Sequence, residues 1–307
     1  SFLVTKTLNM NSHPFAVLFL PRSQDPSKIA GFLGLSWKYF RNEAEGSVVA
    51  TVFVLANQKG GVGKTTSTYN LGVALADIGQ RVLLLDLDPQ GGLTYCAGFE
   101  PEELGKTIYH SLIRNTNPRE VLISNDYGVD LLPANIDLSI AEFQLINAPA
   151  RERRVTKIVN EFRDEYDFIL IDSQPSLGLL TMNSLAAADQ VIIPVSCEYL
   201  SVRGTHALLT LIAKVKGTLN SQLTIAGILP TMFDSRTLHG RAILKLLETE
   251  FPNVHLFPHT VARSIRFAES AAERVPVFEA KIQVPGALAY RELARDLVDR
   301  KSTRLNS

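Results

Sequence analysis

Glycine, lysine and threonine occur at phosphate-binding spacing between residues 59 and 66, in the order Lys-Gly-Gly-Val-Gly-Lys-Thr-Thr. The apolar run 52–56 precedes this stretch and the small-residue segment 67–76 follows it, which predicts a strand, a loop and a helix. Glycines, which lack a Cβ, let backbone N–H groups turn inward around phosphate oxygens, with the positive end of a helix behind them. The stretch is therefore typical of a phosphate-binding P-loop.

The side chains of this loop have distinct expected roles. Lys64 is expected to reach the β- and γ-phosphates, and the Thr65 hydroxyl to ligate Mg²⁺. Thr66 adds a second hydroxyl near the α-phosphate. A Gly-rich turn without a ligand is the alternative, which the order of residue types disfavours. The backbone positions expected to surround the nucleotide are Gly60, Gly61, Val62 and Gly63, and the three glycines can take φ > 0.

The loop opens with a second lysine, Lys59, five residues before Lys64. A lysine at this place has no role in an ordinary P-loop, and it marks the deviant Walker A group. The stretch resembles the ParA/MinD family of dimerising ATPases. This resemblance implies that Lys59 reaches across a dimer interface to the phosphates bound by the partner subunit, so that two like subunits enclose two ATP molecules.

Two further apolar runs end in carboxylates. The run 81–85 leads to Asp86 and Asp88, and the run 167–171 leads to Asp172. Acids at the C-terminal ends of buried strands lie where α/β proteins bind ligands. The resemblance implies that Asp88 orients the attacking water, that Asp86 lies near the Mg²⁺ shell, and that Asp172 holds that shell as the Walker B carboxylate. An exposed acidic turn is the alternative for the first run.

The loop after Asp172 departs from the family pattern. Where the family has a small residue and two prolines, this chain has Ser173-Gln174-Pro175, so that Gln174 replaces the first proline. The departure leaves the Asp172 carboxylate intact, but it bears on the geometry of the following loop and on the rate of ATP turnover.

Strands alternate with helices through the rest of the chain, which predicts an α/β fold with a doubly wound, mostly parallel sheet of the deviant Walker A P-loop NTPase type. The resemblance covers about residues 49–298. Further strands are expected at 129–133, 190–195 and 223–229, and helices at 106–114, 137–145, 151–165, 181–188, from about 200 to 219, and around 290–297.

The segment 231–237 resembles the family segment that lies near the adenine and ends in an exposed arginine. Met232 is therefore a candidate contact for the base, with ordinary core packing as the alternative. The segment 263–266 aligns with a second arginine-containing stretch of the family, although Ala262 stands where the family usually has proline.

Three arginines are the candidate surface for non-specific DNA binding, and a solvated surface charge is the alternative for each. Binding through phosphates would be independent of sequence and steeply sensitive to salt. The candidates are Arg236, Arg263 and Arg266, with Arg241 and Lys245 as possible additions.

The composition is that of a globular protein with a substantial core. The chain has 307 residues, 46% hydrophobic and 20% charged, and its 31 basic residues balance 31 acidic ones. There is thus no global basic signal for nucleic acid. Two cysteines, Cys96 and Cys197, are too few for a disulfide scaffold or a zinc site. Apolar runs such as 191–195 are too short to cross a bilayer, so we expect a cytoplasmic protein without a membrane partner.

Both ends of the chain are expected to be extraneous. Residues 1–47 lack clear periodicity and are interpreted as an extraneous or disordered extension, with a genuine DNA-binding or dimerising arm as the alternative. Residues 48–298 form the expected ATPase domain. Residues 299–307 resemble a translated sequencing adaptor, with a polar tail as the alternative.

The sequence therefore predicts a ParA/Soj-type partition ATPase that uses ATP and Mg²⁺. The resemblance implies an ATP-dependent homodimer that binds DNA non-specifically, associates with the nucleoid in its ATP state, and is released by hydrolysis that a ParB-like centromere-binding protein stimulates. A MinD-like membrane-cycling ATPase for division-site placement is the main alternative. An iron-sulfur reductase related to nitrogenase iron protein and a purely structural ATP-binding scaffold are two further alternatives.

Overall fold

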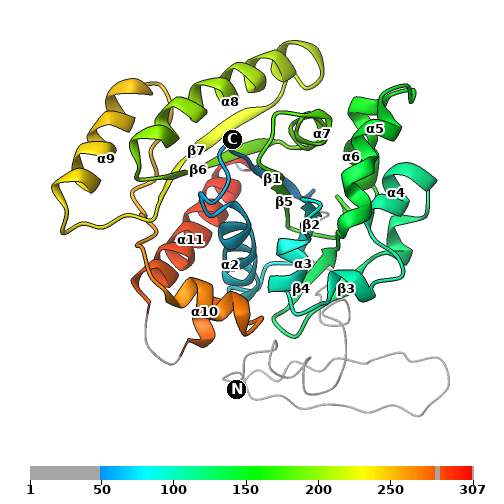
Figure 1. Cartoon of the computed structure of the whole chain (residues 1–307), viewed down its shortest axis with the longest axis horizontal. Coiled ribbons are helices and arrows are strands. Elements are labelled where there is room, and N and C mark those ends of the chain that lie inside the picture. Colours follow the sequence, from blue (N-terminus) through cyan, green and yellow to red (C-terminus); the bar gives the residue numbers. More distant parts are fainter. Residues whose placement is uncertain (1–48, 281–283, 306–307) are drawn as a thin grey trace. The chain divides into compact units, whose positions relative to one another are not determined.

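The computed structural model describes residues 49–280 and 284–305. Within these residues, seven strands form one sheet in the order β3-β4-β2-β5-β1-β6-β7, and only β3 runs antiparallel to its neighbour (Figure 1). This is the doubly wound, mostly parallel sheet that the alternating pattern predicts. The strands are β1 (Thr51–Leu55), β2 (Val82–Leu87), β3 (Ile123–Ser124), β4 (Val129–Leu132), β5 (Phe168–Ser173), β6 (Gln190–Ser196) and β7 (Thr224–Thr231).

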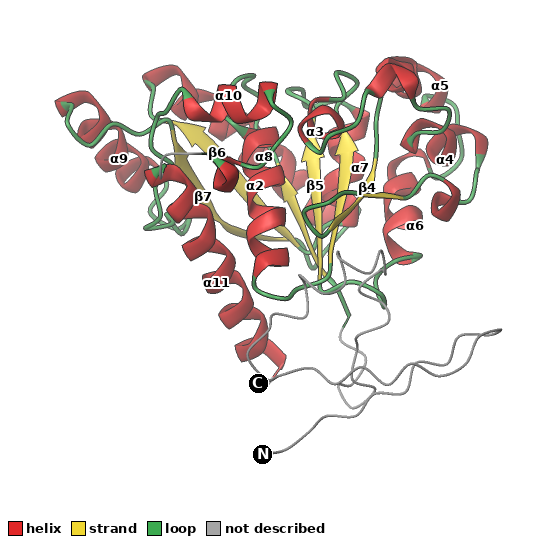
Figure 2. Ribbon diagram, turned by 90° about the horizontal axis from the view of Figure 1, so that it is seen from below, coloured by secondary structure: helices red, strands yellow, loops and turns green. Residues whose placement is uncertain are grey.

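Helices cover both faces of the sheet, with α2, α10 and α11 on one face and α7 and α8 on the other (Figure 2). The described α-helices are α2 (Lys64–Asp77), α3 (Gly92–Cys96), α4 (Ile108–Arg114), α5 (Ala141–Leu145), α6 (Arg154–Asn160), α7 (Leu179–Ala187), α8 (Tyr199–Thr218), α9 (Leu238–Glu250), α10 (Arg266–Ala272) and α11 (Pro285–Leu305). Among these residues no helix combines the length and apolarity that a bilayer crossing needs.

Alternate side chains of the central strands enter two separate cores. On β1, Val52 and Val54 join the core under α6, α7 and α8, whereas Phe53 and Leu55 join the core under α2 and α11. Burial of one such side chain stabilises the fold by about 1.5–3 kcal/mol. Because both faces of each strand are covered, the strands are continuous apolar runs in the sequence, as predicted.

The parallel register aligns the C-terminal ends of the central strands. Leu55 of β1 is the register partner of Asp172 of β5, and Asp172 is in turn the partner of Asp86 of β2. Since β1 leads directly into the P-loop, this register brings the glycine-rich loop and both carboxylates to one edge of the sheet. The backbone pairing of β1, β5 and β2 therefore places these groups at the sheet edge where we predicted the ligand.

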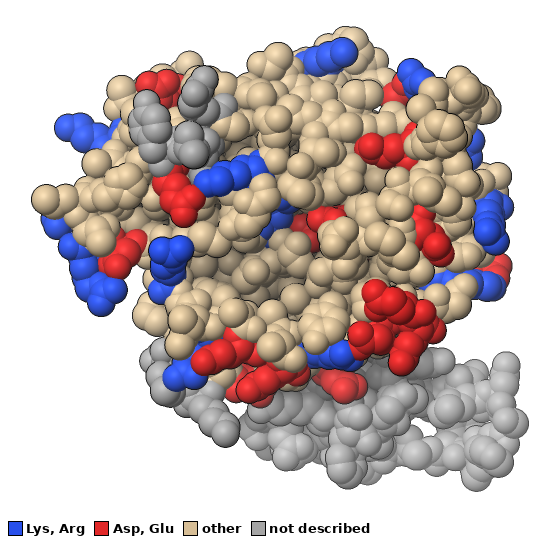
Figure 3. Space-filling model, viewed as in Figure 1, with Lys and Arg blue, Asp and Glu red and all other residues tan. Residues whose placement is uncertain are grey.

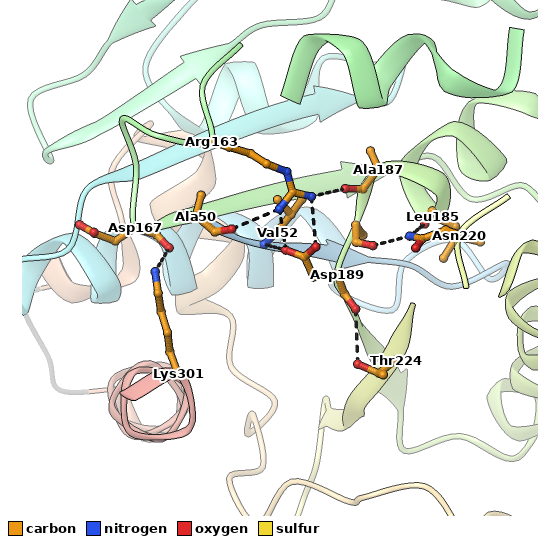
Figure 4. Close-up of polar contacts among 11 residues, drawn as sticks. Ala50, Val52, Arg163, Asp167, Leu185, Ala187, Asp189, Asn220, Thr224 and Lys301 are labelled. Atoms are coloured by element: carbon orange, nitrogen blue, oxygen red, sulfur yellow. Dashed lines mark hydrogen bonds and ion pairs between the residues drawn. The ribbon is translucent and has the colours of Figure 1, made fainter. Parts of the chain in front are cut away.

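The opposite edge of the sheet is held by ion pairs. Figure 4 shows the Asp189 carboxylate accepting from the Val52 N–H at 2.8 Å and from both terminal nitrogens of Arg163 at 3.1 Å. The same guanidinium donates to the carbonyls of Ala50 and Ala187. The half-buried Arg163 guanidinium thereby joins the starts of β1 and β6.

The other ion pair at this edge joins Arg81 to Asp167, which immediately precedes β5. The guanidinium donates to both carboxylate oxygens at 2.7 and 2.9 Å, and the Arg81 N–H adds a third bond at 2.9 Å. Burial alone would raise the pKa of the Asp167 carboxyl, but these hydrogen bonds and the positive charge hold that pKa below its usual value.

Two expected helices differ from the structure. The helix expected over 151–165 is wrong at both ends, because residues 151–153 form a 3₁₀ turn and α6 ends at Asn160. Residues beyond it turn back so that the Arg163 carbonyl accepts from the Ala50 N–H at 2.8 Å. The helix expected over 137–145 is a 3₁₀ turn, Ile136–Ile140, followed by the shorter α5.

The end segments remain predictions. The extension expected over residues 1–47 lies outside the described residues. Within 299–307, α11 continues to Leu305, and Lys301 Nζ donates to the Asp167 carbonyl (Figure 4).

Candidate functional site

The P-loop joins β1 to α2 and has the backbone that its glycines allow. Gly61 and Gly63 adopt left-handed φ values of 70° and 84°, which side chains disfavour. Gly60, which could also take a positive φ, does not do so. A Cβ on Gly61 would meet no atom within 4 Å, so conformation, rather than space, requires glycine there. Val62 is buried, and its carbonyl accepts from Thr231 Oγ1 at 2.8 Å.

A pocket of about 320 Å³ lies over this loop. Most residues predicted to contact nucleotide line it, and they come from three separate segments of the chain. The lining residues are Gly60, Gly61, Gly63, Lys64, Thr65, Thr66, Asp88, Pro175 and Met232. The structure therefore brings the expected P-loop, second-strand and base-contact residues to one cavity.

Lys64 is buried at the base of this pocket. Its Nζ donates to the Lys59 carbonyl at 3.1 Å, which folds the side chain back along the loop. Burial lowers the pKa of the Lys64 ammonium, and the nearby carboxylates of Asp172 and Asp88 act in the opposite direction. A cation in this position faces the space where phosphate oxygens would lie.

Two buried carboxylates lie beside the P-loop threonine. Thr65 Oγ1 donates to Asp172 at 2.6 Å, the arrangement expected of a metal-ligating hydroxyl and a Walker B carboxylate. Burial, and next the charge of Asp86, raise the pKa of Asp172 to about 8. Burial raises the pKa of Asp86 to about 6, against hydrogen bonds donated by Thr94 and by the Asp88 N–H. A cation bound beside these two carboxyls would favour their ionised forms.

This donor set fits Mg²⁺. Hydroxyl and carboxylate oxygens are the ligands that Mg²⁺ prefers, and this ion commonly retains several waters and takes phosphate oxygens. Within the described residues there is no group of three or more His, Cys, Asp or Glu side chains able to hold a metal by themselves. An ion bound at Thr65 would accordingly take further ligands from water and from a bound phosphate.

Asp88 stands between the carboxylate pair and the open pocket. It follows β2 by one residue, and Asp88 Oδ1 accepts from the Gln90 N–H at 3.0 Å. It lines the pocket, while Asp86 is completely buried. The two acids of this segment are thus separated into a buried one beside Asp172 and an accessible one facing the ligand space.

Lys59 lies at the rim and is not directed toward its own P-loop pocket. Its Nζ forms an ion pair of 2.7 Å with Glu198, which precedes α8, and the two side chains are 32% and 51% exposed. The pairing lowers the pKa of the Glu198 carboxyl, with smaller contributions from Arg263 and His239. An ion pair this exposed contributes about 0–1 kcal/mol.

Met232 lines the pocket in a strained conformation. Its φ is 53°, a left-handed value that is rare for a residue with a Cβ. The preceding Thr231 is buried against the P-loop, with its side chain about 3.9 Å from the position that a Cβ on Gly63 would occupy. Strain of this kind persists where the surroundings fix it. The role of Met232 as a base contact stays a prediction.

The candidate DNA-binding arginines lie at or near the surface around α9 and α10. Arg236 is 87% exposed and makes two bonds of 2.9 Å to Asp234, while Arg266 pairs with Glu269 at 2.6 Å. Arg263 is exposed. Figure 3 shows basic side chains gathered at the left margin, where Figure 1 places α9, and the exposed face of that helix carries Arg241 and Lys245. Acidic partners thus offset part of this charge.

The cysteines have no metal-ligating setting. Cys197 is buried directly after β6, and Cys96 ends α3 in a half-buried position. Burial raises the pKa of each thiol to about 11, so both are protonated at neutral pH.

Some residues of the site were missed by sequence reasoning. Glu198 and Pro175 reach the site from loops 139 and 116 residues beyond Lys59, and no periodicity links them to the P-loop. The helix α9, which supports the candidate arginines, could have been found: Thr237 accepts from the Gly240 N–H as its N-cap, and Ile243 and Leu247 are spaced by one helical turn.

Comparison with known proteins agrees with this geometry. A family model described as an AAA domain matches residues 50–225. An uncharacterized protein of Mycobacterium tuberculosis is 46% identical over 253 residues, covering 82% of this chain and 79% of that protein. The chromosome-partitioning ATPase Soj of Treponema pallidum is 40% identical over 252 residues, covering 82% of this chain and 98% of that protein.

A solved structure carries the same fold with ligands. A cobyrinic acid a,c-diamide synthase from Mycobacterium smegmatis, with bound ATP analog and magnesium, has a TM-score of 0.73 and 38% identity, covering 81% of this chain and 95% of that chain. Its ligands are those that the P-loop, Thr65 and the aligned carboxylates were expected to bind. From its site geometry and these relatives, the chain belongs to the ParA/Soj family of partitioning ATPases, P-loop enzymes that hydrolyse ATP with Mg²⁺.

Proposed function

We propose that this ATPase pairs with a second copy of itself when ATP binds, that the pair binds DNA without sequence preference, and that hydrolysis releases it to segregate chromosome or plasmid DNA. The observation that carries the proposal is the placement of Lys59, a half-buried cation at the rim of a nucleotide pocket whose base already holds Lys64. Because the Lys59 side chain points away from its own pocket, it is suited to bind the phosphates of a nucleotide held by a neighbouring copy.

Binding would rest on the loop and its lysine. The N–H groups around Gly61 and Gly63, with the start of α2 behind them, would surround the β- and γ-phosphates, and Lys64 would neutralise them. Thr66 would contact the α-phosphate and Met232 the base, since both line the pocket. These contacts position the nucleotide and leave its terminal phosphate facing Asp88.

Hydrolysis would depend on positioning and charge. Thr65 and Asp172 would hold Mg²⁺, with Asp86 nearby, and the ion supplies positive charge that offsets the charge on the phosphoryl oxygens. Asp88 would orient the attacking water from the open side of the pocket. Lys59 of the neighbouring copy would add a second cation where negative charge develops.

DNA binding would use the exposed arginines. Arg236 and Arg263 are exposed and Arg266 is half-buried, and α9 adds Arg241 and Lys245 nearby. Asp234 and Glu269 offset part of the positive charge of this surface in one copy. Two copies together would double the positive surface available to DNA. A ParB-like protein is the proposed partner that accelerates hydrolysis, and the ATP-bound form would associate with the nucleoid.

The decisive experiment measures DNA retardation of the full chain with ATP and Mg²⁺, with ADP, and without nucleotide, across a salt series. We expect retardation only with ATP, on any sequence, with steep loss as salt rises. Arg263→Glu should weaken it severalfold with ATP turnover retained, whereas the matched variant Arg295→Glu on α11 should not. Retardation that ignores nucleotide, or sedimentation with anionic liposomes in place of DNA, would contradict the proposal, the latter favouring the MinD-like alternative.

A further inference from the structure

Glu142 of α5 reaches into the segment that follows the Walker B carboxylate. Its Oε1 accepts from Gln174 Nε2 at 2.9 Å and from the Leu180 N–H at 2.9 Å. The first contact joins α5 to the loop after Asp172, and the second joins it to the first turn of α7. One carboxylate oxygen therefore connects two parts of the chain that lie 32 and 38 residues beyond it.

This carboxylate takes the place of a cap on α7. Gly178, the residue before the helix, provides no side-chain cap, and the N–H of Leu180 is one of the groups that a helix leaves unpaired at its start. A negative charge at the N-terminus of a helix is stabilised by its dipole. The fit is close, because a Cβ on Gly178 would lie 2.5 Å from Glu142 Oε1.

The segment that Glu142 holds forms one wall of the nucleotide pocket. Pro175 follows Gln174 and lines the pocket, and its Cβ lies 3.8 Å from the position that a Cβ on Gly60 would occupy. On the inner side of the segment, Ser173 Oγ donates to the Leu55 carbonyl at the start of the P-loop at 2.9 Å. The segment is thus fixed at its start by Ser173 and on both sides of Pro175 by Glu142.

We propose that Glu142 is a positioning residue of the ATPase site: through Gln174 and the start of α7, its carboxylate sets where Pro175 and the Walker B segment stand against the P-loop. Gln174, which departs from the family's proline, supplies the side-chain amide that this contact uses. The inference rests on ATP hydrolysis by this site and not on DNA binding or partition.

The structure separates this role from a role in folding. Ala141 and Leu145 hold α5 in the core with at most 2% exposure, while Glu142 is only half-buried. The same helix also carries Gln144, whose Oε1 accepts from Tyr109 Oη at 3.1 Å and takes no part in the contact with α7. Gln144→Ala therefore removes a hydrogen bond of α5 and leaves the proposed link intact.

The test measures single-turnover ATP hydrolysis without DNA, together with the Kd of a fluorescent ATP analogue. Glu142→Ala should slow hydrolysis by about tenfold, because displacement of catalytic groups by a fraction of an ångström has effects of this order, and change the Kd by less than about threefold. Glu142→Gln keeps an acceptor oxygen and should recover most of the rate. Gln144→Ala should hydrolyse at the unmodified rate.

A double substitution sharpens the test and does not depend on the stability of one variant. Gln174→Ala alone should slow hydrolysis by about threefold, since Leu180 still binds the carboxylate. Added to Glu142→Ala, it should cause no further loss, because both act through the same contact. Unmodified hydrolysis by Glu142→Ala, an equal loss in Gln144→Ala, or additive losses in the double variant would each overturn the proposal.

Discussion

The two ends of strand β5 carry carboxylates in opposite electrostatic settings. Asp167, just before the strand, is matched by a guanidinium that donates to both of its oxygens, and the pKa of this carboxyl lies below its usual value. Asp172, near the end of the strand, accepts from hydroxyl groups and lies beside Asp86, and burial raises its pKa to about 8. Asp167, whose charge is paired with an arginine, and Asp172, whose charge is not, are thus five positions apart in the sequence.

The difference indicates what each edge of the sheet is for. At the N-terminal edge, Arg81 neutralises Asp167, and Arg163 neutralises Asp189 (Figure 4), so the strand starts are fixed. At the C-terminal edge, Asp86 and Asp172 are both completely buried, and the Lys64 ammonium acts on Asp172. Carboxylates held in this way are costly to the fold alone, and a bound cation removes that cost.

Exchange of each carboxylate for its amide should separate the two edges most strongly. Asp172→Asn should lower ATP hydrolysis by about 10²–10³-fold, because a Mg²⁺-holding charge is lost, while stability stays equal or rises. Asp167→Asn should retain ATP turnover and lose about 1–3 kcal/mol of unfolding free energy, since its partner guanidinium is left unmatched. Hydrolysis rates and urea unfolding of both variants check this. Loss of turnover in Asp167→Asn with a normal Asp172→Asn would break the comparison.

A second substitution, at Asp88, tests whether the acids at the C-terminal edge have separate roles. Asp88→Ala should bind ATP with nearly the affinity of the parent chain but hydrolyse it about a hundredfold more slowly, because this accessible acid is the one assigned to the attacking water. The ATP-bound pair of subunits should then accumulate. Rapid-quench hydrolysis and equilibrium nucleotide binding measure the two effects, and hydrolysis at the parent rate would remove Asp88 from its assigned role.

The pH dependence of stability should have opposite signs at the two edges. A carboxyl with a raised pKa, such as Asp86 at about 6 or Asp172 at about 8, stabilises the fold fully below its unfolded value near 4, and this contribution is lost as pH rises toward 8. The lowered pKa of Asp167 contributes stability above its unfolded value, and that is lost as pH falls through the folded one.

Thermal unfolding from pH 2 to 9 without Mg²⁺ measures this effect. Asp172→Asn should flatten the decline toward pH 8, and Asp167→Asn should flatten the decline on the acidic side. An unchanged profile in Asp172→Asn would mean that its carboxyl does not titrate in this window.

The strands and the P-loop were predictable because each is local in the sequence. Continuous apolar runs ending in Asp86 and Asp172 predict buried parallel strands with acids at one edge, and the register of β2 with β5 places those acids side by side. The pairing of Lys59 with Glu198 was not predictable, because 139 residues separate them and the contact exists only once β6 lies beside β1.

The remaining errors have local causes. The helix expected to continue to residue 165 ends at Asn160. Beyond it, the Arg163 guanidinium donates to Asp189, and the Arg163 carbonyl accepts from the Ala50 N–H, contacts that a continuing helix would not allow. Similarly, Glu142 gives no sequence signal of its contact with Gln174, which lies on a later loop. Side chains that act across the fold are the part of a site that periodicity cannot identify.

The most direct test of the central claim is the molar mass of the full chain by light scattering, with ATP and Mg²⁺ present and hydrolysis slowed by Asp88→Ala. The Asp88→Ala variant alone should form a dimer. When Lys59→Ala is added to it, the protein should bind nucleotide yet stay monomeric, and when Lys64→Ala is added, nucleotide binding itself should be lost. Nucleotide-driven dimers of Lys59→Ala, as stable as those of the parent, would contradict the assignment of this lysine to the neighbouring subunit's phosphates.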